Sequence, residues 1–187
     1  RINKLLFDYY KYRKLARSIL RFCGYLAFND ASSNNLLRGN VDRAMNVDKL
    51  SLLKCDILVQ VDNFEAGGLE NVVLDLNQSL IGAGYQIVLL VIGNVGLGVQ
   101  RAREQGMTVI IGSFDLNSYS VLIGCLKPQL VLSHYSIHGV ELCAQKSIPF
   151  IQVIHNIYMW FDSKQVLEFA NAAQKTTVFI AVSEYVK

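Results

Sequence analysis

The chain has 187 residues and is 52% hydrophobic with only two prolines, a composition that excludes a disordered protein and allows one full domain with an appendage. The net charge of +3 is uneven, because residues 1–50 carry +6 and residues 51–187 carry −3; the mildly acidic larger part argues against nucleic acid as the main partner. No apolar run approaches the roughly 20 residues of a membrane-spanning helix, and the basic start has no secretory signal.

Residues 1–50 form a helical leader and linker outside the main pattern. Residues 1–28 mix apolar and basic side chains as a basic amphipathic helix does, and such a helix either lies on an anionic membrane surface or packs on its own domain or a second copy. The spacing suits packing. Residues 29–40 are rich in turn residues and predict a linker, and residues 41–54 predict a short helix.

The cysteines and the two ends of the sequence bear on where the protein is located and on whether the sequence is part of a longer one. Four scattered cysteines without paired spacing are typical of a reduced, cytoplasmic protein, which the leader would bring to a membrane only peripherally. The chain starts at Arg1, and only one helical turn follows a helix-capping serine, Ser183. We therefore expect a segment of a longer polypeptide.

Residues 51–187 alternate between apolar strands and amphipathic helices. This alternation predicts an α/β fold, a Rossmann-like doubly wound parallel sheet with helices on both faces, and ligands at the carboxyl ends of its strands. The predicted strands are Ile57–Val61, Ile87–Ile92, Thr108–Ile111, Leu130–Ser133, Phe150–Ile154 and Val178–Val182. The predicted helices are Leu69–Leu80, Gly98–Gln105, Ser118–Cys125, Val140–Lys146 and Gln165–Gln174.

The first strand, turn and helix carry the glycine pair Gly67 and Gly68. Glycine lets a ligand approach the backbone closely, and the first N–H groups of the helix would face a phosphate or a sugar. The alternative is a tight turn without a ligand. Glu70 in the first helical turn favours the helix dipole but opposes a phosphate, which favours a neutral or hydroxyl-bearing ligand.

Histidines follow two of the later strands. His134 and His138 have the spacing of metal ligands on a helix, but no third ligand follows and we expect no metal. His155 and Asn156 end an apolar strand at the ligand side of the sheet. His155 is either a satisfied structural residue or a group that binds a sugar hydroxyl or acts as a base.

Two further stretches have alternative readings. Gly93, Gly96 and Gly98 lack the spacing of a dinucleotide fingerprint and predict a plain loop. The aromatic residues within 158–161 suit contacts with a sugar or lipid, or a hydrophobic lid over a neighbouring helix.

Three stretches together resemble the N-terminal domain of a family 4 (group 1) glycosyltransferase with the GT-B fold. They are VDNFEAGGLENVVLDLNQSLIGAGYQIVLLV, PFIQVIHNIYMW and FIAVSEYVK, and the resemblance covers about residues 56–187. It implies the N-terminal half of two facing Rossmann-like domains, in which this half binds the acceptor and the absent C-terminal domain holds the nucleotide-sugar donor. No cofactor or metal is implied.

The resemblance also implies roles for single residues. Gly67 and Gly68 would meet the diphosphate and sugar of the donor, and His155 would contact the transferring sugar or the acceptor. His134, Glu70, Asn156 and Ser183 are further candidates for substrate binding. The expected activity is retaining transfer of a sugar to a glycan or lipid-linked hydroxyl group. The alternatives are half of a GT-B sugar-nucleotide epimerase and a non-enzymatic Rossmann-like interaction module.

Overall fold

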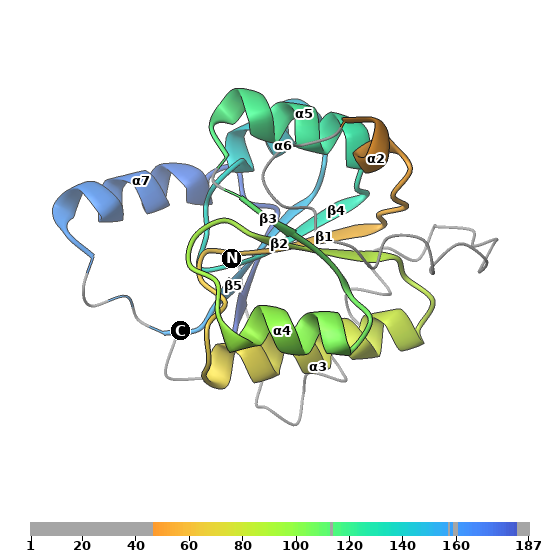
Figure 1. Ribbon diagram of the computed structural model, residues 1–187. Helices are drawn as coiled ribbons and strands as arrows, with labels where there is room; N and C mark the ends of the chain where they lie inside the picture. The colour runs from red at the N-terminus through yellow and green to blue at the C-terminus, as the bar shows by residue number, and fades with distance from the viewer. Residues whose placement is uncertain (1–46, 113, 157, 159–160, 183–187) are drawn as a thin grey trace.

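The computed structural model of the protein describes residues 47–112, 114–156, 158 and 161–182 (Figure 1). Six parallel strands form one sheet in the order β3-β2-β1-β4-β5-β6, and helices alternate with the strands along the chain. The predicted Rossmann-like, doubly wound α/β fold is therefore confirmed.

The strands and helices lie where the apolar periodicity predicts them, with ends that differ by no more than two residues. The strands are β1 (Ile57–Val61), β2 (Ile87–Val91), β3 (Thr108–Ile111), β4 (Leu130–His134), β5 (Phe150–Ile154) and β6 (Val178–Ala181). The helices are α2 (Val47–Ser51), α3 (Gly68–Gly82), α4 (Leu97–Glu104), α5 (Leu116–Leu126), α6 (Val140–Gln145) and α7 (Ser163–Ala173).

The sheet separates two hydrophobic cores. Helices α3 and α4 cover one face, and α5 and α6 cover the other (Figure 1). Strands β1, β2 and β4 are buried at every position, as strands covered on both faces of a parallel sheet are. Their residues are apolar except for Gln60, Ser133 and His134, which are buried as well. The chain crosses from β3 at one edge to β4 beside β1, so the topological switch point lies between β1 and β4.

Helix α2 spans residue 50, the boundary expected between leader and domain. Leu50 is only 1% exposed and packs in the core beneath α5. The rest of the leader, including residues 1–28, lies outside the described residues. None of the described helices is both long enough and apolar enough to cross a membrane.

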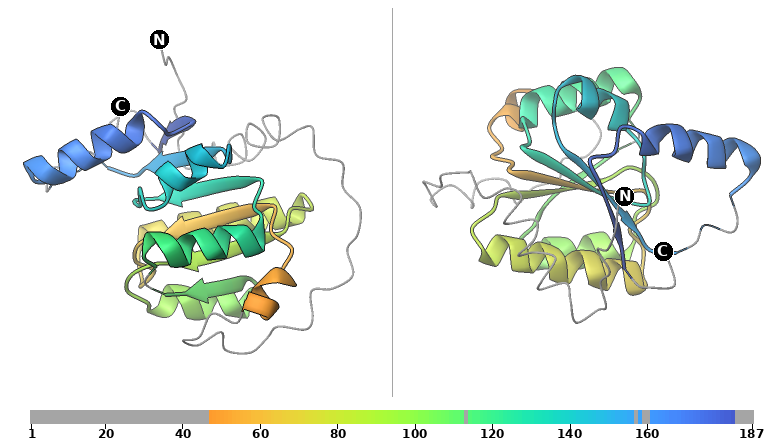
Figure 2. Two further views of the ribbon diagram at one scale, coloured as in Figure 1. Left: turned by 90° about the horizontal axis from the view of Figure 1, so that it is seen from above. Right: turned by 180° about the vertical axis from the view of Figure 1, so that it is seen from behind.

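Helix α7 projects from the body of the molecule (Figure 2). Of its side chains only Ala172 is buried, so tertiary packing contributes little to its formation. A capping box compensates for this at its first turn. The Asp162 carboxylate accepts a hydrogen bond from the Gln165 backbone N–H (2.8 Å), and the Gln165 side chain accepts one from the Asp162 N–H (2.9 Å).

A buried polar network fixes the loop between β4 and α6. The Gln60 amide of β1 donates to the hydroxyl of Ser133 (3.0 Å) and to the carbonyl of His138 (2.9 Å). Its oxygen accepts a hydrogen bond from the hydroxyl of Tyr119 on α5 (2.7 Å). The Ser133 hydroxyl donates to the carbonyl of Ser136. These bonds tie the loop to β1 and α5 at the switch point.

The same network explains why residue 139, which ends this loop, is a glycine. Its backbone has a left-handed φ of 78°. A Cβ at Gly139 would overlap the ring of Tyr119. We therefore expect Gly139→Ala to lower the free energy of unfolding by about 2–4 kcal/mol, through overpacking and backbone strain. Urea denaturation measures this change.

Gly124 in α5 is the matched control, because a Cβ there meets no atom within 4 Å. Gly124→Ala should raise the free energy of unfolding by about 0.5–1 kcal/mol, since alanine suits a helix better. Similar effects of the two substitutions would contradict this account of the loop.

Candidate functional site

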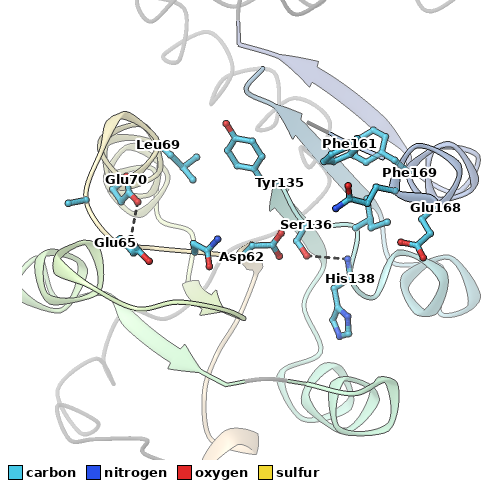
Figure 3. A pocket seen from close by; sticks show the side chains of 14 residues that line it. Asp62, Glu65, Leu69, Glu70, Tyr135, Ser136, His138, Phe161, Glu168 and Phe169 are labelled. Atoms are coloured by element: carbon cyan, nitrogen blue, oxygen red, sulfur yellow. Dashed lines mark hydrogen bonds between the residues drawn. The ribbon is translucent and has the colours of Figure 1, made fainter. Parts of the chain in front are cut away.

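The loops after β1, β4, β5 and β6 meet at the carboxyl edge of the sheet and line two open hollows. The first, which we call the Asp62 hollow, has a volume of about 670 Å³ (Figure 3). The second, the His155 hollow, has a volume of about 660 Å³. Leu69 and Tyr135 line both, so the two hollows adjoin.

Carboxylates dominate the polar lining of the Asp62 hollow. Asp62 lies directly after β1, Glu65 and Glu70 come from the β1–α3 region, and Glu168 comes from α7; among the residues that the structure describes, no Lys or Arg lines the hollow. Burial raises the pKa of Asp62, and a hydrogen bond from Ser136 and the nearby His138 oppose this rise. The hollow therefore suits hydroxyl or ammonium donors and disfavours anions.

Glu70 is the most buried of these carboxylates, with 6% of its surface exposed. One of its oxygens accepts a hydrogen bond from the Glu65 backbone N–H at 3.0 Å, which closes the loop before α3 (Figure 3). The structure thus gives Glu70 a structural contact, and its side chain lines the Asp62 hollow but not the His155 hollow.

Aromatic rings form one wall of the Asp62 hollow. Phe161 and Phe169 line it directly, and Tyr158 stacks on Phe161 with ring centroids 4.7 Å apart. Tyr158 also meets the edge of Tyr135. The aromatic run after β5 therefore forms a cluster with α7, as the hydrophobic-lid reading expects, and two of the rings also face the hollow. Residue 160 lies outside the described residues.

Tyr135 divides the two hollows. It follows β4 directly, with a left-handed φ of 66°, and its ring stacks on the imidazole of His155 (centroids 5.1 Å apart, planes at 19°). Asn156 holds it there, because its amide donates to the Tyr135 hydroxyl at 2.5 Å. Asn156 lines neither hollow, so it acts through Tyr135.

The His155 hollow brings Gly68 and His155 together. Gly67 and Gly68 are exposed, and Gly67 precedes the first turn of α3 without a side-chain cap. Gly67 has extended backbone, and a Cβ at Gly68 would meet no atom within 4 Å. Neither backbone conformation nor packing among the described residues therefore requires glycine at position 68. The Glu70 carboxylate lies beside this helix start, with its Oε2 atom 3.1 Å from where a Cβ of Gly67 would be.

The glycines after β2 differ from Gly68 in this respect. A Cβ at Gly93 would lie 2.6 Å from the Asp62 carbonyl oxygen, and a Cβ at Gly96 would lie 2.9 Å from the Glu65 Cα. These glycines let the β2–α4 loop pack against the β1–α3 loop. They serve packing within the fold, consistent with the plain loop that the spacing predicts.

His134 and His155 form a close pair. The Nδ1 atom of His134 lies 2.8 Å from the Nε2 atom of His155, so one proton is shared between two imidazoles. Burial holds the pKa of His134 well below its usual value and lowers the pKa of His155 to about 4, so both rings are neutral near pH 7. His134 is 0% exposed, and its contact is with His155 instead of the hollow.

The remaining candidate residues, His138 and Ser183, do not belong to the His134–His155 pair. His138 lines the Asp62 hollow, with its ring edge-on to Tyr119 (centroids 4.9 Å apart), so it does not share a site with His134. Within the described part of the chain, no three His, Cys, Asp or Glu side chains converge as metal ligands. Ser183 lies outside the described residues.

Asp62, Tyr135 and Ser136 line the Asp62 hollow, and the sequence does not single out any of them. All three lie in loops 62–68 and 134–138, which directly follow predicted strands and are expected to hold a ligand. Only the geometry shows which side chains of these loops face a hollow.

Comparison of the chain with models of protein families, with curated proteins and with solved structures finds no match. The resemblance to family 4 glycosyltransferases therefore remains a prediction from the sequence motifs.

The histidine pair predicts how stability depends on pH. Unfolded histidine titrates near about pH 6.5, whereas the folded pKa values of His134 and His155 are lower. The unfolded state therefore binds more protons below about pH 6.5, and each histidine should cost up to about 1.4 kcal/mol per pH unit as the pH falls toward 5. Urea denaturation between about pH 7 and 5 measures this loss.

His155→Gln should make the fall shallower, because one titrating group is removed. The raised pKa of Asp62 acts in the opposite sense, because the folded state then binds more protons than the unfolded state while this carboxyl group titrates. An unchanged slope in His155→Gln would show that the buried pair does not exist in solution.

Proposed function

We propose that the chain is the acceptor-side half of a retaining glycosyltransferase, which moves a sugar from a nucleotide-sugar donor to a hydroxyl group of a glycan or lipid-linked acceptor. One observation carries the proposal. Gly68 and His155, which the sequence motifs single out independently, line the same hollow at the carboxyl edge of the sheet. A second hollow adjoins it, and transfer needs two substrates side by side.

The His155 hollow takes the diphosphate and sugar of the donor. Glycine at position 68 leaves room for a phosphate or sugar oxygen beside the N–H groups at the start of α3. Two carboxylates oppose a phosphate here. Asp75 lines the same hollow, and Glu70 lines the other hollow, with one oxygen on the Glu65 N–H and the second 3.1 Å from where a Cβ of Gly67 would lie. The backbone donors at the start of α3 would stabilise the negative charge of the departing diphosphate against these carboxylates.

The Asp62 hollow takes the acceptor. Its carboxylates accept hydrogen bonds from sugar hydroxyls, and Phe161 and Phe169 offer flat apolar surface to the C–H face of a sugar ring. The absence of Lys and Arg from the lining, among the described residues, favours an acceptor without phosphate or carboxylate groups near the reacting hydroxyl.

His155 contacts the transferring sugar in this proposal. With a pKa near 4 it is a poor proton acceptor at neutral pH, so it binds a sugar hydroxyl and does not act as a general base. Tight binding of the nucleotide requires a further, C-terminal domain, and no metal or cofactor takes part.

One observation favours the alternative of an interaction module. Val166 and Leu167 on the projecting helix α7 are 54% and 61% exposed. These apolar side chains offer a surface to another protein or domain. This alternative requires neither hollow to bind a sugar. Nothing in the described residues favours the epimerase over these two.

We expect Gly68→Val to reduce turnover of the complete protein on the order of 10²-fold or more, because the new side chain fills the space where the donor approaches. Stability should change little, since the added Cβ meets no atom within 4 Å. Release of nucleoside diphosphate from a panel of UDP- and GDP-sugars measures the turnover.

Gly82→Val is the matched control, because Gly82 lies at the other end of α3 and has equally open surroundings. It should leave turnover unchanged. Unchanged kinetics in Gly68→Val would remove the glycine turn from the donor site.

The acidic lining predicts discrimination between acceptors. Of two alkyl glycosides that differ only in a 6-phosphate, the phosphorylated one should have a KM about tenfold higher. Glu168→Gln should narrow this difference to a few-fold, because it removes one of the repelling charges. Steady-state kinetics with each glycoside measures both values.

Glu104→Gln on α4 provides the control, since Glu104 is exposed and lines neither hollow. It should leave the ratio of KM values unchanged. Equal KM values for the two glycosides in the unmodified protein would place the acceptor outside the Asp62 hollow.

A further inference from the structure

His134 is buried in an apolar part of the fold, although it carries two polar ring nitrogens. It is the last residue of β4 and lies on the same face of the sheet as Leu130 and Leu132, which belong to the core beneath α3 and α4. It is 0% exposed. Its Nδ1 atom contacts His155 Nε2 at 2.8 Å, and its Nε2 atom has no hydrogen-bond partner among the described residues.

Two arrangements of protons satisfy this contact, because each neutral imidazole carries one proton. In the first, His134 donates from Nδ1 to His155 Nε2, and the proton of His155 is then on its Nδ1 atom. In the second, His155 donates from Nε2, and the proton of His134 is on its buried Nε2 atom. The arrangements differ in the group at the Nδ1 atom of His155, which is a donor in the first and an acceptor in the second, and His155 lines the hollow.

The surroundings of His134 Nε2 distinguish the two. The second arrangement buries an N–H group without an acceptor, and orphaned donors of this kind are rarer in folded proteins than acceptors that lack a full set of partners. The first arrangement leaves only a bare nitrogen in the core. The stacked ring of Tyr135 keeps the His155 ring in place, so the ring cannot turn to exchange its nitrogens freely.

We propose that His134 is a positioning residue that fixes the tautomer of His155, so that His155 presents its Nδ1–H group as a hydrogen-bond donor to the ligand in the His155 hollow. The ligand atom that this donor recognises is an oxygen with a free lone pair, such as a sugar hydroxyl or ring oxygen. This assignment rests on the proposed function only for the identity of the ligand, since the tautomer itself belongs to the chain alone.

Nitrogen-15 NMR of the 187-residue chain labelled at histidine tests the tautomer without any substrate. The chain contains only three histidines, so the ring nitrogens are readily assigned by substitution. We expect His155 to carry its proton on Nδ1 and to show scalar coupling through the shared proton to His134 Nδ1. A proton on His155 Nε2 in the unmodified chain would overturn the proposal.

Two substitutions at His134 separate positioning from packing. His134→Asn keeps an N–H donor near the place of Nδ1, whereas His134→Leu fills the space with an apolar side chain. We expect His134→Asn to keep the Nδ1–H tautomer of His155 despite a lower thermal stability, and His134→Leu to lose the tautomer preference despite equal or higher stability. If stability and tautomer preference changed together, His134 would be a packing residue only.

Turnover of the complete protein tests whether the tautomer of His155 matters for the ligand. His134→Leu should reduce turnover about tenfold to 10²-fold, as loss of an aligned donor does, and His134→Asn should restore most of it. If NMR shows the Nδ1–H tautomer of His155 in the unmodified chain but His134→Leu has unchanged turnover, the tautomer assignment stands and the role of His155 as a donor to the ligand is overturned. Absence of any sugar transfer by the unmodified protein would instead reject the proposed function.

Discussion

The arrangement of the site depends on the hydrogen bonds of the side-chain amide of Gln60. It lies on the central strand β1 with no exposed surface, and all its hydrogen bonds go to groups that the switch in strand order brings beside β1. A buried amide of this kind is costly unless it is paired, so the loop after β4 is held in the one position that pairs it. Tyr135 and Ser136 reach their places because that loop is fixed.

The charge of the site is unevenly distributed between the two hollows. Asp62, Glu65, Glu70 and Glu168 line the Asp62 hollow, whereas Asp75 is the one carboxylate among the described residues that line the His155 hollow. The start of α3 also lies at the His155 hollow, through Gly68 and Leu69. Under the proposed function, the diphosphate of the donor would occupy the less acidic of the two hollows.

The fold could be predicted from the sequence because each strand is a short apolar run and each helix has a regular apolar stripe. Leu76 and Leu80 are buried as the period of α3 requires, and Asp75 and Gln78 are exposed. The candidate site can be predicted only in part. Gly68 and His155 stand out in their loops, and the structure places both along one hollow. The pairing of His134 with His155 depends on strand register, which places His134 beside Val153 and so brings His155 to the same face two residues later.

The position of Tyr135 between the two hollows bears on whether they bind ligands independently. Because its ring lines both hollows, a ligand that moved the ring out of one hollow would narrow the other, and binding in the two would then be coupled. Such coupling is reciprocal. If a ligand in the Asp62 hollow changes the affinity of the His155 hollow for a second ligand by some factor, the second ligand changes the affinity of the Asp62 hollow for the first by the same factor. A single aromatic side chain, stacked on His155 and hydrogen-bonded to Asn156, would thus couple ligand binding in two adjacent hollows.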